Sequence, residues 1–401
     1  MPRADVRSAF QYGLVIFTLT ALLGLANATQ LFGGLDRNTL LTHLHSGTLG
    51  WITMGVIGVT VWIFGGADRN MAVRLSALST AAYVLAFWSG NLYARATFGV
   101  TELLVILYWW WFAVSSARAE GFGRIDIPKL SLTLGLTTIV VGSSLGVVVQ
   151  LLLASGSSTN PQDIVGGHAS AQIGGYLVLV AAGIADWQLT GGGKRTRAGL
   201  AQAWSLFAGG IVLAIGVLLN VQPLLGLATL LQVIGIVIVI VRFGRIALGT
   251  SWMEKSGRRH VAIAVPFLVL GLGLEIALLQ QIVAAQGDFT KVSVGLNHAL
   301  DHSMFVGLMT NALFGAIFIA TAGSRSWSWA DDLVFWGLNI GAASFIAVLL
   351  FVGSGEGAKP FTSPVSFTAP IMGLAALLGI ATLLMRLQEA PAMVTAAAPA
   401  R

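Results

Sequence analysis

Long apolar segments recur along the whole chain and constrain its fold more than any other feature. About twelve runs of roughly 20 residues are apolar enough to cross a bilayer as α-helices. The chain is 56% hydrophobic and 9% charged, a balance that water-soluble domains of 401 residues do not have. The sequence therefore predicts an all-α integral membrane protein with a single polytopic domain over 1–401. The expected spans are 9–32, 39–65, 72–93, 98–117, 130–154, 165–189, 198–220, 223–248, 261–284, 293–321, 332–353 and 366–387.

The basic residues predict the orientation of these spans. With the N-terminus in the cytoplasm, 18 of the 22 Lys and Arg residues lie in cytoplasmic segments. The other four, Arg37, Arg95, Lys291 and Lys359, lie in outer loops. This asymmetry predicts a cell (inner or plasma) membrane protein with both termini cytoplasmic and no cleaved signal peptide. The net charge of +6 therefore sets topology, so lipid rather than nucleic acid is the expected partner.

Five of the six histidines fall within the second, sixth and tenth spans. They are His43 and His45, then His168, then His298 and His302. The three spans are separated by four helices each time, which suggests repeats over 1–125, 126–255 and 256–390 in three four-helix arcs with pseudo-threefold symmetry. All three spans run from outside to inside, so the imidazoles lie roughly 5–15 Å below the outer boundary. Intramembrane ionisable residues are costly and are usually functional.

These histidines predict heme b or another metal. His43 and His45 differ by roughly 200° around the helix and can serve two sites at nearly the same depth. Arg37 and Arg95 lie on the outer side, where they can pair with heme propionates. The chain has no cysteine, which excludes covalent heme, thiolate iron–sulfur clusters and thiolate copper. Interhelical hydrogen bonding alone is the structural alternative for these imidazoles.

His298 and His302 are four residues apart and share one helix face. Either both bind one non-heme metal (copper or iron), with Asp301 as a ligand or as an orienting group, or one is a single axial ligand and the other its hydrogen-bond partner. Glu275 lies deep in the ninth span, as a proton-relay or ligand-binding group or as a neutral carboxyl bonded to a neighbouring helix. Glu102 and the sixth histidine, His260, are expected at the membrane interfaces, with His260 snorkelling on the cytoplasmic side.

The run His43-Leu-His45-Ser-Gly-Thr-Leu-Gly-Trp51 resembles the His-x-His-x-Gly-x-Leu-Gly-Trp motif in the catalytic subunit of C-family (cbb-type) heme–copper oxidases. In that family the two histidines bind different hemes, and twelve helices form three four-helix arcs. The resemblance implies that His168 is the facing ligand of the low-spin heme. It also places the span of His298 and His302 where the copper-binding helix stands.

The chain departs from the oxidases in three ways. The motif opens the second span, whereas in the oxidases it lies on the tenth helix. The eleventh span carries no histidine pair, and no tyrosine follows a histidine by four residues. A twelve-helix heme- and copper-containing family linked to nitric oxide metabolism is similar in size and helix count.

Together these features predict a heme-b-binding membrane protein of oxidase-like fold that handles electrons or a diatomic gas, nitric oxide or oxygen. If it is an enzyme, it is an oxidoreductase that takes electrons from quinol or an external carrier. One alternative is a proton- or cation-coupled secondary transporter that uses the histidines and Glu275. Another is a structural partner of a respiratory complex.

Overall fold

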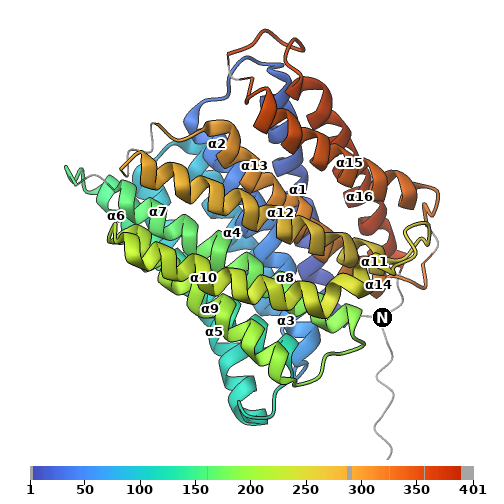
Figure 1. Cartoon of the computed structure of the whole chain (residues 1–401). Coiled ribbons are helices and arrows are strands. Elements are labelled where there is room, and N and C mark those ends of the chain that lie inside the picture. The colour runs from blue at the N-terminus through green and yellow to red at the C-terminus, as the bar shows by residue number, and fades with distance from the viewer. Residues whose placement is uncertain (1–2, 160, 287–290, 325, 356, 390–401) are drawn as a thin grey trace, which may run out of the picture.

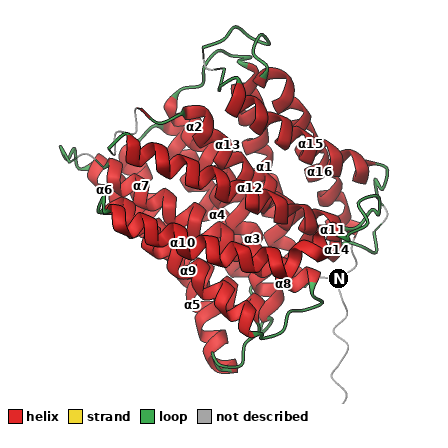
Figure 2. Ribbon diagram, in the orientation of Figure 1, coloured by secondary structure: helices red, strands yellow, loops and turns green. Residues whose placement is uncertain are grey.

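The computed structural model describes residues 3–159, 161–286, 291–324, 326–355 and 357–389. Within these ranges the regular elements are helices, joined by short loops (Figure 1, Figure 2). Twelve helical segments are long and apolar enough to span a membrane. This confirms the prediction of an all-α integral membrane protein.

Three of the spans are interrupted by a central π-helical segment (η), and one more contains a π-helical turn near its C-terminal end. In chain order the spans are α1 (Ala4–Thr29); α2, η1 and α3 (Arg37–His45, Ser46–Thr53 and Met54–Phe64); α4 (Asn70–Ser89); α5 (Leu92–Glu120); α6 (Ile127–Ala154); α7, η2 and α8 (Gln162–Ser170, Ala171–Leu177 and Val178–Leu189); α9 (Arg197–Leu218); α10, η3 and α11 (Gln222–Val239, Ile240–Gly244 and Arg245–Leu248); α12 (Gly257–Ala284); α13, η5 and α14 (Val294–His302, Ser303–Thr310 and Asn311–Ala320); α15 (Ala330–Phe351); and α16 (Val365–Glu389).

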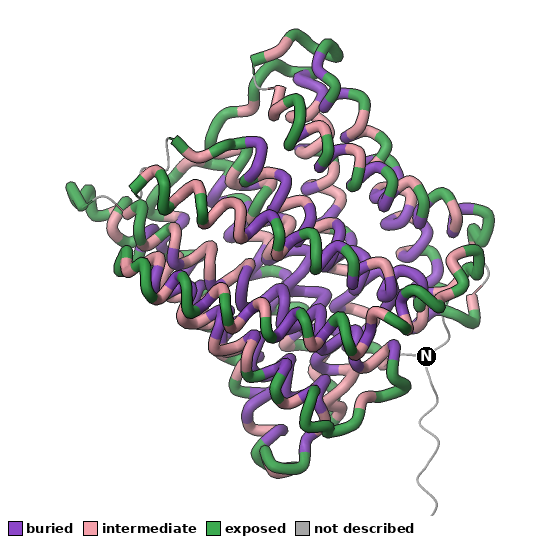
Figure 3. Tube along the Cα trace, viewed as in Figure 1, coloured by how far each residue is buried: buried purple, intermediate pink, exposed green. Residues whose placement is uncertain are grey.

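The three histidine-bearing spans form the inner layer of the bundle. In their most apolar windows, 72% (α2–α3), 56% (α7–α8) and 83% (α13–α14) of the residues are buried. The other spans in the described ranges have 33–50% buried. Figure 3 shows the same concentration of buried residues in the middle of the molecule. The second, sixth and tenth spans are thus surrounded by the rest.

The outer helices close around this inner layer in three arcs. Within the first arc α1 packs on α4 and α4 on α5; within the second α6 packs on α9 and α9 on α10. In the third arc α15 packs on α16. The arcs meet where α5 packs on α6, α10 on α12, and α16 on α1. These contacts divide the described spans into three groups of four, here called repeats 1, 2 and 3, that begin at α1, α6 and α12.

Glycines allow the inner helices to approach the first helix of each repeat. A Cβ atom on Gly50 would lie 2.2 Å from Ile16 of α1, and one on Gly307 would lie 2.2 Å from Phe267 of α12. Gly175 holds the same position in repeat 2, where its Cβ would lie 3.1 Å from Thr138. Small residues of this kind permit the close helix packing that stabilises membrane proteins.

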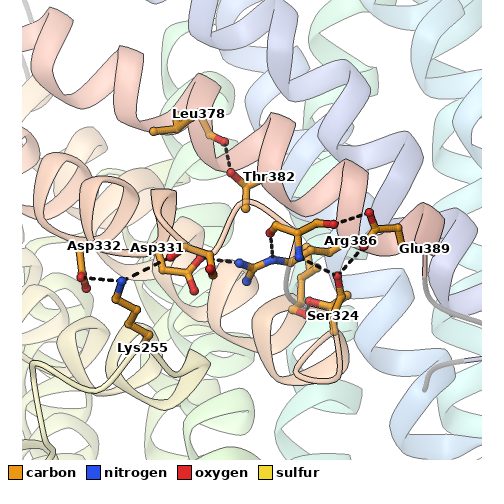
Figure 4. Close-up of polar contacts among 12 residues, drawn as sticks. Lys255, Ser324, Asp331, Asp332, Leu378, Thr382, Arg386 and Glu389 are labelled. Carbon is orange, nitrogen blue, oxygen red and sulfur yellow. Dashed lines mark hydrogen bonds and ion pairs between the residues drawn. The ribbon is translucent and has the colours of Figure 1, made fainter.

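Charged side chains pair on the face that carries the chain termini. Arg386 donates to Asp331 at 2.7 Å, and the Lys255 ammonium lies 3.2 Å from the Asp332 carboxylate (Figure 4). Ser324 donates to Glu389 in the same cluster. Lys255 and Arg386 are among the basic residues predicted to be cytoplasmic, and both have acidic partners on this face.

Candidate functional site

The first turn of α2 fixes the position of its two histidines. Asp36 is the N-cap: its carboxylate accepts from the Asn38 backbone N–H at 2.8 Å and from the Thr39 hydroxyl at 2.6 Å. Hydrogen bonds from Thr39 lower the pKa of Asp36 below its usual value. The helix starts at Arg37, so that His43 and His45 fall in its last turn.

His43 and His168 occupy equivalent places in repeats 1 and 2. Each stands three residues before its π-helical segment. Nδ1 of His43 lies 2.9 Å from the Thr20 carbonyl of α1, and Nδ1 of His168 lies 2.7 Å from the Gly142 carbonyl of α6. We call this the anchor position, because the ring is held by the preceding span.

A glycine next to each anchor makes room for the imidazole. It lies four residues after the bonded carbonyl, at Gly24 in α1 and Gly146 in α6. A Cβ there would lie 2.9 Å from Cε1 of His43 and 3.0 Å from Cε1 of His168. Any larger residue would push the ring away from its carbonyl partner.

His45 and His302 form a second equivalent pair. Each is the last residue before its π-helical segment and each bonds its own helix: Nδ1 lies 2.7 Å from the Leu41 carbonyl and 2.8 Å from the His298 carbonyl, respectively. His45 stacks on Phe87 of α4 with ring centroids 3.8 Å apart, whereas His302 meets Phe345 of α15 at 4.6 Å. We call this the rim position. It faces the third helix of each repeat.

All four rings are held in the form that binds metals. A carbonyl oxygen can only accept a hydrogen bond, so each Nδ1 carries the proton. In a neutral imidazole this leaves the Nε2 lone pair as the donor atom. Metal-binding histidines are commonly oriented by such a bond from the second nitrogen to a carbonyl. None of the four side chains is fully buried, although their helices are the most enclosed in the molecule.

The anchor and rim histidines pair across the boundaries between repeats. His45 interacts electrostatically with His168, across the boundary of repeats 1 and 2 (the 1–2 interface). His302 interacts with His43, across the boundary of repeats 3 and 1 (the 3–1 interface). His298 also interacts with His43 there. The two histidines of α2 therefore interact with imidazoles of different repeats.

The boundary of repeats 2 and 3 (the 2–3 interface) lacks both histidines. Ser170 stands at its rim position and Leu300 at its anchor position. The aligned elements are otherwise the same: Gly271 of α12 corresponds to Gly24 and Gly146, and the Phe267 carbonyl four residues earlier accepts a bond from Ser303. Two of three equivalent interfaces are therefore equipped with imidazole pairs.

The two interfaces that have a histidine pair each also have a side-chain hydrogen bond between repeats, eight residues further along the inner spans. Tyr176, eight residues after His168, donates to Thr53 at 3.3 Å across the 1–2 interface. Trp51, eight residues after His43, donates to Thr310 at 3.0 Å across the 3–1 interface. In the 2–3 interface the aligned residues are Leu308 and Val178, which have no polar side-chain atoms. The histidine pairs and these polar bonds occur at the same two interfaces.

The two arginines predicted to bind propionates have different surroundings. Arg95 is 4% exposed, donates to Asn38 at 2.6 Å and to the Phe87 carbonyl at 2.8 Å, and interacts electrostatically with His45. Its Nε is buried without a hydrogen-bond partner. Arg37 is exposed at the start of α2. Arg95 is thus the cation next to the 1–2 pair, and Arg37 lies farther out.

Asp301 is half-buried in α13 and makes no hydrogen bond or ion pair with another described residue. Within the described ranges no three His, Asp or Glu side chains are close enough together to hold a metal ion. The predicted site of His298, His302 and Asp301 is therefore not assembled as a three-ligand centre in this structure. His302 instead bonds the backbone of His298 and faces His43.

Two interfacial predictions were wrong. His260 is only 1% exposed; its Nδ1 lies 3.1 Å from Asn311, and its ring stacks on Phe318. Glu102 is 2% exposed and accepts hydrogen bonds from two hydroxyl groups of α4. Both residues find polar partners inside the bundle, so they need not reach the membrane surface.

Comparison of the chain with known protein families and with curated proteins finds no match.

Proposed function

We propose that this chain binds heme b at the 1–2 and 3–1 interfaces and handles electrons or a diatomic gas, nitric oxide or oxygen. The observation that carries the proposal is the repetition of one arrangement. At two of three equivalent interfaces an anchor histidine interacts electrostatically with a rim histidine, and each ring has its Nδ1 bonded to a carbonyl. The likeness of the His43–Trp51 run to the cbb-type oxidase motif points the same way.

The residues present fit this cofactor. The donors are neutral imidazoles with free Nε2 atoms, which are the usual axial ligands of b-type heme. Gly24 and Gly146 make room for the anchor rings, and Arg95 supplies a buried cation beside His45. A bound heme would supply one-electron chemistry and gas binding. The protein would contribute ligand orientation and an apolar, enclosed setting.

The two interfaces suit different tasks. At the 1–2 interface His45 and His168 are the two imidazoles, which is a ligand set for electron transfer. At the 3–1 interface a third imidazole, His298, also interacts with His43, and Asp301 is nearby in sequence. We assign gas binding, and any additional metal such as copper or iron, to that interface. Electrons would come from a quinol or an external carrier.

The pseudo-threefold arrangement favours this proposal over a secondary transporter. Transporters are commonly built from twofold-related repeats with a substrate site near the membrane midplane. Here the histidines lie in the first helical segments of the inner spans, away from the middle. Glu275 is the observation that favours the transporter, since it is buried without a charged partner among the described residues.

A visible spectrum of the purified protein tests the proposal. We expect a Soret band, sharp reduced bands, a pyridine hemochrome of b type, and no covalently attached heme. Metal analysis of the same sample identifies any second metal. A colourless preparation from heme-replete cells would refute the proposal and leave the transporter as the better interpretation.

We also propose that the histidine-bearing ends of the inner spans face away from the cytoplasm. The basic residues and both termini share the opposite face, as the positive-inside rule requires for cytoplasmic termini. A reporter fused to the C-terminus should be active only in the cytoplasm. Activity on the outside would reverse the depth assignment of all five histidines.

A further inference from the structure

The 2–3 interface, which lacks the histidine pair, contains a buried carboxyl group instead. Glu275 of α12 is 6% exposed and lies four residues after Gly271. Its side chain bonds that of Gln232 of α10, which is 2% exposed. Repeats 2 and 3 therefore meet through a carboxyl–amide contact.

The π-helical segment of repeat 2 completes this contact. Gln232 Nε2 donates to the Gly174 carbonyl of η2 at 3.2 Å. A Cβ on Gly174 would lie 2.6 Å from Gln232 Nε2 and 2.8 Å from Glu275 Oε1. Only glycine lets both side chains rest against the helix backbone at this point. The three residues come from three different spans and form one compact polar group.

One acceptor in this group lacks a donor. Gln232 Oε1 is buried without a hydrogen-bond partner among the described residues. An amide offers both N–H donors and a carbonyl acceptor, so it can donate to a carboxylate or accept from a protonated carboxyl. Because the orientation of an amide is assigned from its partners, Gln232 can serve either protonation state of Glu275.

No charged side chain compensates Glu275 in the described structure. Two inner spans and the segments that follow α10 pack against α12. Their charged or titratable residues are His298, Asp301 and His302 of α13, Asp186 of α8, Arg242 of η3 and Arg245 of α11. Asp186 and Arg242 pair with each other at 2.7 Å. An isolated carboxylate inside a membrane protein is expensive, so a proton is the natural counter-charge.

We propose that Glu275, Gln232 and Gly174 form a proton-binding site at the 2–3 interface, and that its proton compensates electrons entering the 1–2 and 3–1 interfaces. When a quinol or an external carrier delivers one electron, one solvent proton binds an oxygen of the Glu275 carboxylate, and this proton leaves again when the electron does. The second half of this inference rests on the proposed heme function. A metal cation is disfavoured because the Gly174 carbonyl already accepts from Gln232.

Infrared difference spectroscopy of the whole protein tests the site without any need for heme. A protonated-carboxyl band should titrate with pH in the wild type and disappear in Glu275→Gln. Glu102→Gln is the matched control, because Glu102 is equally buried but is held by hydroxyl donors. Gln232→Leu should keep the band and shift both its frequency and its titration midpoint. A titrating band that survives in Glu275→Gln overturns the proposal, as does a band that responds to sodium at constant pH.

The midpoint potential of the bound heme tests the coupling. One proton per electron lowers the potential by up to about 59 mV per pH unit. We expect a pH-dependent potential in the wild type and in Glu102→Gln, and a flat one in Glu275→Gln. A flat wild-type profile, or an unchanged slope in Glu275→Gln, refutes the coupling. Absence of heme refutes the proposed function and its coupling, whereas the infrared result still decides whether the proton site exists.

Discussion

The 1–2 and 2–3 interfaces are built from equivalent helices but carry different side chains. In both, the inner span of the later repeat packs on the first helix of that same repeat at an aligned glycine, Gly146 in α6 and Gly271 in α12. The first presents His45 and His168, and the second presents Ser170 and Leu300 in their places. A central π-helical segment is present in the inner span of all three repeats, including the one without a histidine at its rim position, so these segments do not depend on the histidine sites.

The 1–2 and 2–3 interfaces differ in several polar side chains at once. Where the histidines are present, a polar bond such as Tyr176–Thr53 lies beneath them. Where they are absent, Leu308 and Val178 replace that bond, and Glu275 introduces a carboxyl group instead. Buried polar groups are stable only with partners, so the removal of one member makes its neighbours costly. The histidine pair and the hydrogen bond near it are therefore present together or absent together at an interface.

The largest expected effect comes from removing one histidine of a pair. His45→Ala and His168→Ala should remove the same heme, and His43→Ala and His302→Ala should remove the other. The reason is that each pair holds one site at one interface. Heme content and the reduced spectrum of each purified variant measure this, and about half of the heme should remain in every case.

The assignment of two histidines to one heme is tested by which variants lose the same absorption bands. Loss of one set of bands in His45→Ala and of a different set in His168→Ala would show that these residues do not share a site. Unchanged spectra in His43→Ala, His45→Ala and His168→Ala together would refute histidine ligation altogether. His260→Ala is the control, since His260 is a more deeply buried imidazole that bonds Asn311 within repeat 3.

Steady oxygen reduction to water is expected to be absent. With His43 and His302 holding heme, His298 is the remaining imidazole of the 3–1 interface for an additional metal, and the described residues contain no group of three His, Asp or Glu that could hold a metal ion. Asp301 as an oxygen ligand would favour iron or another divalent metal over copper held by three imidazoles. Oxygen uptake by the purified protein with reduced quinol or cytochrome measures this. Rapid, cyanide-sensitive uptake would contradict the prediction.

Much of this arrangement follows from the sequence. Apolar length predicts the spans, and the recurrence of histidine in every fourth helix suggests the repeats. The inner position of the histidine-bearing spans was not predicted. Two histidines spaced two residues apart, His43 and His45, must face different neighbours on any helix. His168 interacts electrostatically with His45, and its role as the facing heme ligand, which the oxidase resemblance implies, stays a prediction.

Other parts of the site could not be predicted because they depend on tertiary contacts. An i–5 hydrogen-bond pattern leaves no periodic signal in the apolar runs, so the π-helical segments were not expected. The electrostatic interaction of His302 with His43 joins repeats 3 and 1 and has no signal in the sequence, whereas metal binding by His298 and His302 stays a prediction. His260 was misplaced because Arg258 and Arg259 precede it, and charged neighbours suggest an interface even where the ring turns inward.

Enlarging an anchor glycine should have an intermediate effect. Gly24→Ala places a Cβ 2.9 Å from His43, and Gly146→Ala places one 3.0 Å from His168. The ring must shift from its carbonyl partner, so we expect weakened heme retention at one interface and normal retention at the other. Gly273→Ala is the control, because nothing lies within 4 Å of its Cβ position. Equal loss in Gly273→Ala would attribute the effect to the helix rather than to the site.

The smallest expected effect concerns the polar bonds below the histidine pairs. Tyr176→Phe removes the 3.3 Å bond to Thr53 and leaves the ring in place. The net loss of such a bond is about 0.5–1.5 kcal/mol, with a further cost if the Thr53 hydroxyl is left without a partner. Thr53 retains its 2.9 Å bond to the Thr48 carbonyl, so the lower end of that range is expected. The stability of the detergent-solubilised protein should fall slightly, with heme content unchanged.

If the polar bond and the histidine pair act as one unit, Tyr176→Phe should shift the bands assigned to His45 and His168 and spare those of the 3–1 interface. Leu308→Phe changes the aligned residue of the 2–3 interface and should shift neither set. A shift of the 3–1 bands alone would contradict the pairing of interfaces derived from the repeats. The two phenylalanine variants thus compare an interface that holds a histidine pair with its histidine-free counterpart at the same depth.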